Sequence, residues 1–166
     1  GGLDVAYLFD TAGDDLFTSS SDTAGFAGTG LTAYGFPRVV AYAGSGHDRA
    51  ILNGTDGRDV FLARQGLATL SRGLFIQGAV GFEHVVARSG GGPDVARLFG
   101  SAAVDLFAAG PLAAAMLAQD EFGTPIYRLD AVGFATVVGQ AVGGGDERVA
   151  HRAQLVADEP GDPLRP

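Results

Sequence analysis

The chain of 166 residues contains no cysteine, no lysine and no tryptophan. Without cysteine there is neither a disulfide framework nor a thiolate metal site. Without lysine every basic side chain is an arginine, and the formal net charge is −8. Nucleic-acid binding depends on lysine and arginine neutralising phosphates, so we expect no nucleic-acid partner for so acidic a chain.

Long apolar runs are also missing, although 46% of the residues are hydrophobic. That fraction is too high for a disordered chain. No run reaches the 18 or so apolar residues that a membrane-spanning helix needs, so we expect no membrane span. The short motifs of serine hydrolases and phosphate-binding loops are absent as well. We therefore do not expect an enzyme.

The residues that are abundant favour turns. There are 27 glycines and 7 prolines, and aspartate outnumbers glutamate by 15 to 4. Runs of five or six β-forming residues end in Gly-, Ser- and Asp-rich clusters about every 11 residues, which predicts short strands. The segment 111–122 has some helical character, but its counterpart GLATLSRGLF indicates a strand. The fold class predicted is all-β.

A block of sequence recurs three times. The pattern Gly-Phe-x-x-Val-Val begins at Gly35, at Gly81 and again at Gly133. An aspartate follows each block in the same phase, and a second aspartate and a second phenylalanine follow the first two blocks. The length varies only before the next Gly-Phe, which gives a period of 44–52 residues. The aligned aspartates are Asp48, Asp94 and Asp146, then Asp15, Asp59 and Asp105, and the aligned phenylalanines are Phe17, Phe61 and Phe107.

The repeat predicts a parallel β-solenoid, of the β-helix or β-roll type, built from about three repeats of 44–52 residues. Four strand-and-turn units per repeat would make two coils, and stacked coils pair their backbone groups and bury inward side chains as columns. A twisted β-sandwich or a propeller-like array is the alternative. The predicted columns are Phe17, Phe61 and Phe107 in one, and Phe36, Phe82 and Phe134 in the other.

The recurring block sets the domain boundaries. We expect residues 1–153 to form a single repeat domain and the Pro- and Asp-rich residues 154–166 to form a C-terminal tail or cap. The chain begins and ends at the same phase of the repeat. Uncapped ends of that kind predict head-to-tail stacking of copies, or neighbouring repeats in a longer chain.

The aspartate turns are the candidate metal site. "AGSGHDRAI" and "SGGGPDVAR" resemble the nine-residue repeat of the RTX family of secreted calcium-binding β-rolls. That resemblance implies calcium at Asp15, Asp48, Asp59 and Asp94. The alternative is that each aspartate caps its own turn by accepting backbone N–H groups.

Asp10 begins an Asp-Thr-x-Gly motif that is similar to an aspartic-protease loop. The aligned positions are Gly54 and Gly100, however, and such a protease needs two loops whose carboxylates share a proton. We therefore expect no proteolytic activity.

The whole pattern resembles repeat regions in large secreted or surface proteins of bacteria. The resemblance covers about residues 1–150 and implies an extracellular or cell-surface structural protein: a fibre, a spacer, or a surface-layer or adhesin component. One alternative is a carbohydrate-binding or carbohydrate-cleaving β-helix, with polysaccharide contacts in the segment 111–132. Another is a calcium-dependent folding module of a secreted protein. The polar and aromatic residues of that segment are Asp120, Glu121, Tyr127, Arg128 and Asp130.

Overall fold

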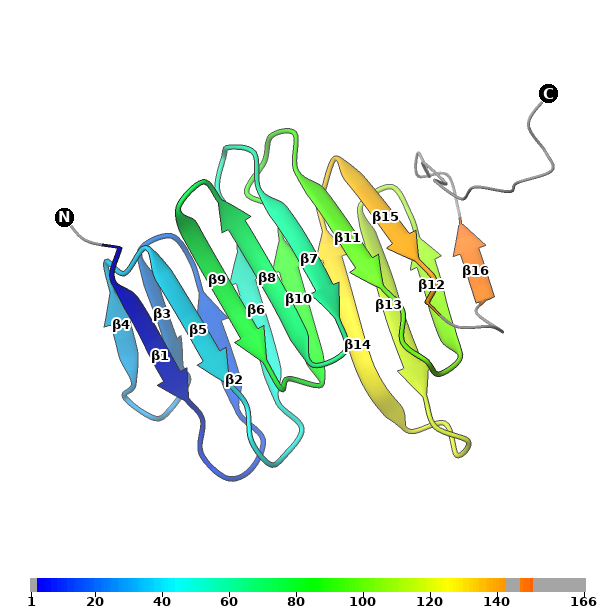
Figure 1. The fold of residues 1–166 in the computed structure, drawn as a ribbon, viewed down its shortest axis with the longest axis horizontal. Coiled ribbons are helices and arrows are strands. Elements are labelled where there is room, and N and C mark those ends of the chain that lie inside the picture. The colour runs from blue at the N-terminus through cyan, green and yellow to red at the C-terminus, as the bar shows by residue number, and fades with distance from the viewer. Residues whose placement is uncertain (1–2, 143–146, 151–166) are drawn as a thin grey trace.

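The computed structural model describes residues 3–142 and 147–150, and this part of the chain is all-β (Figure 1). The segment 111–122, which has some helical character, contains strand β13 (Ala113–Gln119) and no helix. The described residues hold no helix long and apolar enough to cross a bilayer. The predicted tail 154–166 and Asp146 lie outside the described residues.

The strands form two sheets, here called sheet A and sheet B. Sheet A has seven strands, in the spatial order β1 (Val5–Phe9), β5 (Arg38–Tyr42), β9 (Phe75–Val80), β8 (Leu67–Arg72), β7 (Val60–Arg64), β11 (Val95–Phe99) and β15 (Thr136–Gln140). Sheet B has nine, in the order β16 (Glu147–Ala150), β12 (Asp105–Ala109), β13 (Ala113–Gln119), β14 (Pro125–Val132), β10 (His84–Arg88), β6 (Arg49–Asn53), β2 (Leu16–Ser19), β3 (Thr23–Phe26) and β4 (Thr32–Tyr34).

The predicted parallel β-solenoid is wrong, because both sheets are mixed. Parallel pairs such as β1–β5 and β6–β10 do occur between successive parts of the chain. The variable segments, however, fold back as antiparallel hairpins within one sheet, in β2–β3–β4, β7–β8–β9 and β12–β13–β14. The result is two sheets packed face to face instead of a closed coil (Figure 1).

The hairpins also explain why the predicted phenylalanine columns do not form. Phe36, Phe82 and Phe134 precede β5, β10 and β15, which lie in sheets A, B and A. Their environments differ accordingly: Phe36 is 38% exposed, whereas Phe82 is 2% exposed. The second predicted column is divided in the same way, because β2, β7 and β12 carry Phe17, Phe61 and Phe107 in sheets B, A and B.

The core lies between the two sheets, and the two-residue period of the strands fills it. In β2, Phe17 and Ser19 are buried while Leu16 and Thr18 are exposed. Small inward residues let the sheets approach closely: a Cβ on Gly139 of sheet A would lie 2.6 Å from the ring of Phe107 in sheet B. Alternating burial and small inward side chains therefore build one continuous apolar layer.

Candidate metal centre

The four predicted metal ligands lie in the structure as two pairs. Asp15 and Asp48 stand immediately before β2 and β6, which are parallel neighbours in sheet B. The backbone N–H of Asp15 donates to Oδ1 of Asp48 at 2.8 Å. Asp59 and Asp94 stand before β7 and β11 of sheet A, where the N–H of Asp59 donates to Oδ1 of Asp94 at 2.6 Å.

The first aspartate of each pair also caps its own turn. Oδ2 of Asp15 accepts the backbone N–H and the hydroxyl of Thr11, at 3.2 and 3.0 Å. Oδ2 of Asp59 accepts the same two groups of Thr55, at 2.7 and 3.0 Å. These carboxylates therefore hold their own turns closed. The link to the neighbouring turn is made by the backbone N–H of the same residue, which donates to the second aspartate of the pair.

A third carboxylate joins only one of the pairs. One carboxylate oxygen from each of Asp10, Asp15 and Asp48 lies within 4.8 Å of the other two. Oδ2 of Asp10 accepts the N–H of Gly44 at 2.6 Å, which brings the turn after β1 against the turn after β5. In the sequence Asp10 resembles only a protease residue, because Gly44 and Asp48, which it approaches here, are more than 30 residues away in the chain.

Glu83 adds a fourth acidic group beside Asp48. Its Oε2 accepts the backbone N–H of Asp48 at 2.8 Å. Burial raises the pKa of Asp48 above its ordinary value, and the negative charges of Asp10, Glu83 and Asp15 raise it further, against the lowering effect of the Asp15 N–H. This group of carboxylates, here called the acidic cluster (Asp10, Asp15, Asp48 and Glu83), is thus strained by like charge.

In the segment 111–132, the alternative polysaccharide site, Tyr127 and Asp120 form hydrogen bonds within the protein. Tyr127 is 1% exposed, and its hydroxyl donates to Oδ1 of Asp105 in the interior. Asp120 accepts the N–H groups of Phe122 and Thr124, at 2.9 and 2.8 Å, and so caps its own loop. The aromatic side chain expected to face a ligand therefore belongs to the core.

A second polar group lies on the outer face of sheet B, around Asp130. Its Oδ2 contacts Nε2 of His84 at 2.7 Å, and Arg128 donates to both carboxylate oxygens, at 2.8 and 2.9 Å. Burial raises the pKa of Asp130, but hydrogen bonds from His84 and Arg128, with their charge, outweigh burial and hold it below its ordinary value. Asp130, His84 and Arg128 thus form an ion-pair network on this face.

We expect Asp130→Asn to destabilise the protein by about 1–2 kcal/mol at pH 7, because the amide loses the charge-assisted bonds to both partners. A carboxylate with a depressed pKa contributes stability above its unfolded pKa of about 3.9 and loses it as pH falls through the folded pKa. The gap between the wild type and the variant should therefore shrink by about pH 3. Urea unfolding at both pH values measures it, and a gap independent of pH contradicts the expectation.

Aromatic side chains gather on the outer face of sheet A. Phe9 and Tyr42 stack with ring centroids 5.1 Å apart, and Tyr7 lies 6.3 Å from Tyr42. Tyr7 and Phe9 are well exposed. Flat exposed rings of this kind can stack against another apolar or sugar surface.

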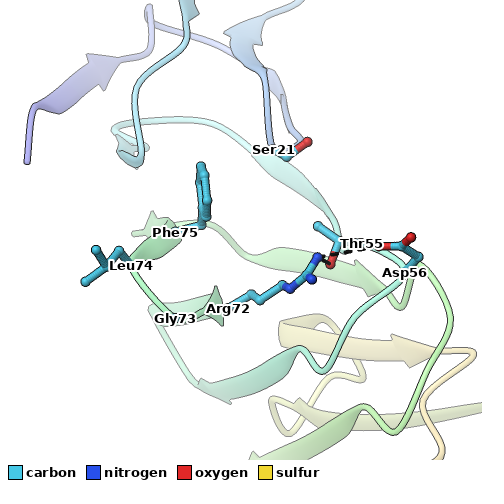
Figure 2. Close-up of a pocket in the computed structure, with 7 residues that line it drawn as sticks. All are labelled: Ser21, Thr55, Asp56, Arg72, Gly73, Leu74 and Phe75. Atoms are coloured by element: carbon cyan, nitrogen blue, oxygen red, sulfur yellow. Dashed lines mark hydrogen bonds and ion pairs between the residues drawn. The ribbon is translucent and has the colours of Figure 1, made fainter. Parts of the chain in front are cut away.

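A hollow lies between three turns (Figure 2). Its charged groups are already paired: Arg72 Nη1 donates to Oγ1 of Thr55 at 2.8 Å and lies 3.5 Å from Oδ1 of Asp56. The cavity measures about 590 Å³ and is lined by Ser21, Thr55, Asp56, Arg72, Gly73, Leu74 and Phe75.

The fold and these sites define an all-β protein of two facing mixed sheets, whose turns are closed by aspartate carboxylates. Comparisons with protein-family models, curated proteins and solved structures found no match to this chain.

Proposed function

We propose that this chain is an extracellular or cell-surface structural protein that associates end to end with further copies of itself through its open strand edges. It would act as a fibre, spacer or surface component and not as an enzyme. The observation that carries this proposal is the geometry of the sheet edges. The sequence resemblance to bacterial surface repeats supports the location.

Among the described strands, each sheet ends in an unpaired edge strand at both ends of the molecule. Sheet A ends in β1 and β15, and sheet B ends in β4 and β16 (Figure 1). In both sheets the two edge strands run in the same direction, because only the middle strands of the hairpins, β3, β8 and β13, are reversed. One end can therefore continue the other by parallel pairing in both layers at once.

The edge of β1 offers a free backbone ladder. Asp10 donates its N–H to the carbonyl of Tyr42 in β5. Because backbone groups alternate sides along a strand, those of Tyr7 and Phe9 face away from β5. No charged residue or proline interrupts β1, whose sequence is VAYLF. Such an unprotected edge promotes strand addition.

The edge of β15 is complementary. The N–H of Thr136 donates to the carbonyl of Asp94, next to β11, so Val137 and Gly139 turn their backbone groups outward. Two strands of five residues, each with alternating free donors and acceptors, can then pair along their whole length. A second copy is thus the partner whose edge matches best.

We expect the wild type to form concentration-dependent oligomers, and Tyr7→Pro to be at least tenfold weaker in assembly, because proline removes an outward N–H without breaking the β1–β5 ladder. Tyr7→Val is the matched control: it loses the same ring but keeps the N–H, so it should still assemble. Light scattering after size-exclusion chromatography and negative-stain microscopy measure both. A wild type that stays monomeric at millimolar concentration overturns the proposal.

A further inference from the structure

We propose that the carboxylates of Asp10, Asp15 and Asp48 bind one divalent cation of the calcium class, which ties the turn after β1 to the turn before β6. The site needs one molecule only. It is therefore independent of the end-to-end association proposed above.

The first argument is the packing of like charges. Asp15 and Asp48 stand before adjacent parallel strands, whose spacing of about 4.8 Å keeps their side chains close. Asp10 then adds an oxygen within 4.8 Å of both. No described arginine or histidine forms an ion pair with these three carboxylates. Negative charge held together in this way needs a proton or a cation to balance it.

The second argument is a buried oxygen of Asp48. The residue is 1% exposed, and its Oδ1 is used by the N–H of Asp15. Its Oδ2 is inaccessible to solvent and has no hydrogen-bond partner. A carboxylate oxygen is costly to bury unsatisfied, and the charged groups around this one, Asp10, Asp15 and Glu83, are all acidic. A bound cation would satisfy it.

The chemistry of the ligands selects the ion. Three carboxylates without any sulfur or imidazole ligand favour a hard cation that prefers oxygen. Asp10 and Asp15 are only partly buried, so the ion has a route from solvent and room for water ligands. Calcium accepts such mixed, irregular oxygen shells more readily than magnesium, which demands a regular octahedron.

The Asp59–Asp94 pair provides an internal control. It has the same N–H to carboxylate bond, and Oδ2 of Asp94 is likewise without a partner. However, Gly54 stands where the first pair has Asp10, so the third carboxylate is missing. The second pair therefore lacks the third carboxylate, and we assign the site to the first pair alone.

The test is thermal unfolding and isothermal titration calorimetry with CaCl₂ against EDTA. At a calcium concentration about 100 times the dissociation constant, the melting temperature of the wild type should rise by about 5–10 °C. Asp10→Asn keeps an acceptor for the Gly44 N–H but removes a charge, and it should lose the shift and the binding heat. Asp94→Asn, in the control pair, should keep both. Magnesium should give a smaller shift than calcium.

Asp10→Gly is a second variant, because the chain itself places glycine at both aligned positions, Gly54 and Gly100. It too should melt cooperatively without a calcium response. A wild type without calcium-dependent heat overturns the site, as does an equal response in Asp10→Asn. If the melting temperature instead rises only when the pH is lowered, with or without calcium, a shared proton balances the acidic cluster and the inference is wrong. Repeating the titration with Tyr7→Pro separates this outcome from any failure of assembly.

Discussion

Phe82→Ala is expected to lower the free energy of unfolding by about 3–5 kcal/mol, because it removes a whole ring from the core. Phe82 is 2% exposed and packs against two other rings, with centroids 6.1 Å from Phe17 and 6.2 Å from Phe26. Phe17 and Phe26 are paired across β2 and β3, and Phe82 lies in the connection just before β10. The cavity left by alanine could not be filled without moving these segments of the chain.

Phe36→Ala is the matched control, since Phe36 occupies the same position of the repeat. It is 38% exposed and forms no ring contact with the Phe82 cluster, so alanine there should cost about 1 kcal/mol or less. Urea or guanidinium unfolding of both variants gives the comparison. Equal losses would mean that the two phenylalanines share one environment, as in a stacked column, and would contradict the arrangement of two sheets.

Gly46→Ala should also be severe, with a loss of about 2–5 kcal/mol. Gly46 has φ near +145°, a conformation that residues with a side chain rarely adopt, and a Cβ there would lie 2.1 Å from the carbonyl oxygen of Gly13. The two turns are bonded at this point, since the N–H of Gly13 donates to the carbonyl of Ser45 at 2.9 Å. Any side chain at position 46 must push the turns apart.

Gly28→Ala separates the conformational strain of a positive φ from the steric clash of an added Cβ. Gly28 also has a positive φ, of +77°, but an added Cβ would meet no atom within 4 Å. Alanine there should cost only the conformational strain, about 1–2 kcal/mol. Differential scanning calorimetry of both variants checks the expectation. If Gly46→Ala is no worse than Gly28→Ala, the close approach of the turns is not present in solution.

The sequence alone was sufficient to predict an all-β chain of short strands and turns, although not the number of strands per repeat. Alternating residues such as Val39 and Ala41 predict one buried face, and Gly- and Asp-rich clusters predict reversals, because both signals act within a few residues. The same local character shows in the turn-capping by Asp15 and Asp59, which needs only a hydroxyl four residues earlier. Alternating burial, chain reversals and turn-capping would be present whichever strands are neighbours.

The composition of the candidate metal site could not be predicted from the sequence. Sequence pointed to Asp15 and Asp48, since both follow glycine-rich turns. It gave no reason to join Asp10 to them, because that contact depends on Gly44, 34 residues away. Only the stacking of the turns decides which carboxylates share a space.

The pairing of strands was likewise decided by the tertiary structure. If each repeat had four strands that alternated between the two sheets, the next repeat would begin in the same sheet. Aligned phenylalanines would then lie in one sheet and stack. Each complete repeat instead has five strands, such as β5 to β9, and the last three stay in one sheet as hairpins. The chain then crosses between sheets an odd number of times per repeat, so equivalent residues alternate between sheets. Inward–outward alternation is the same in a hairpin as in a coil, and for that physical reason the local pattern carried no information about the partner strand.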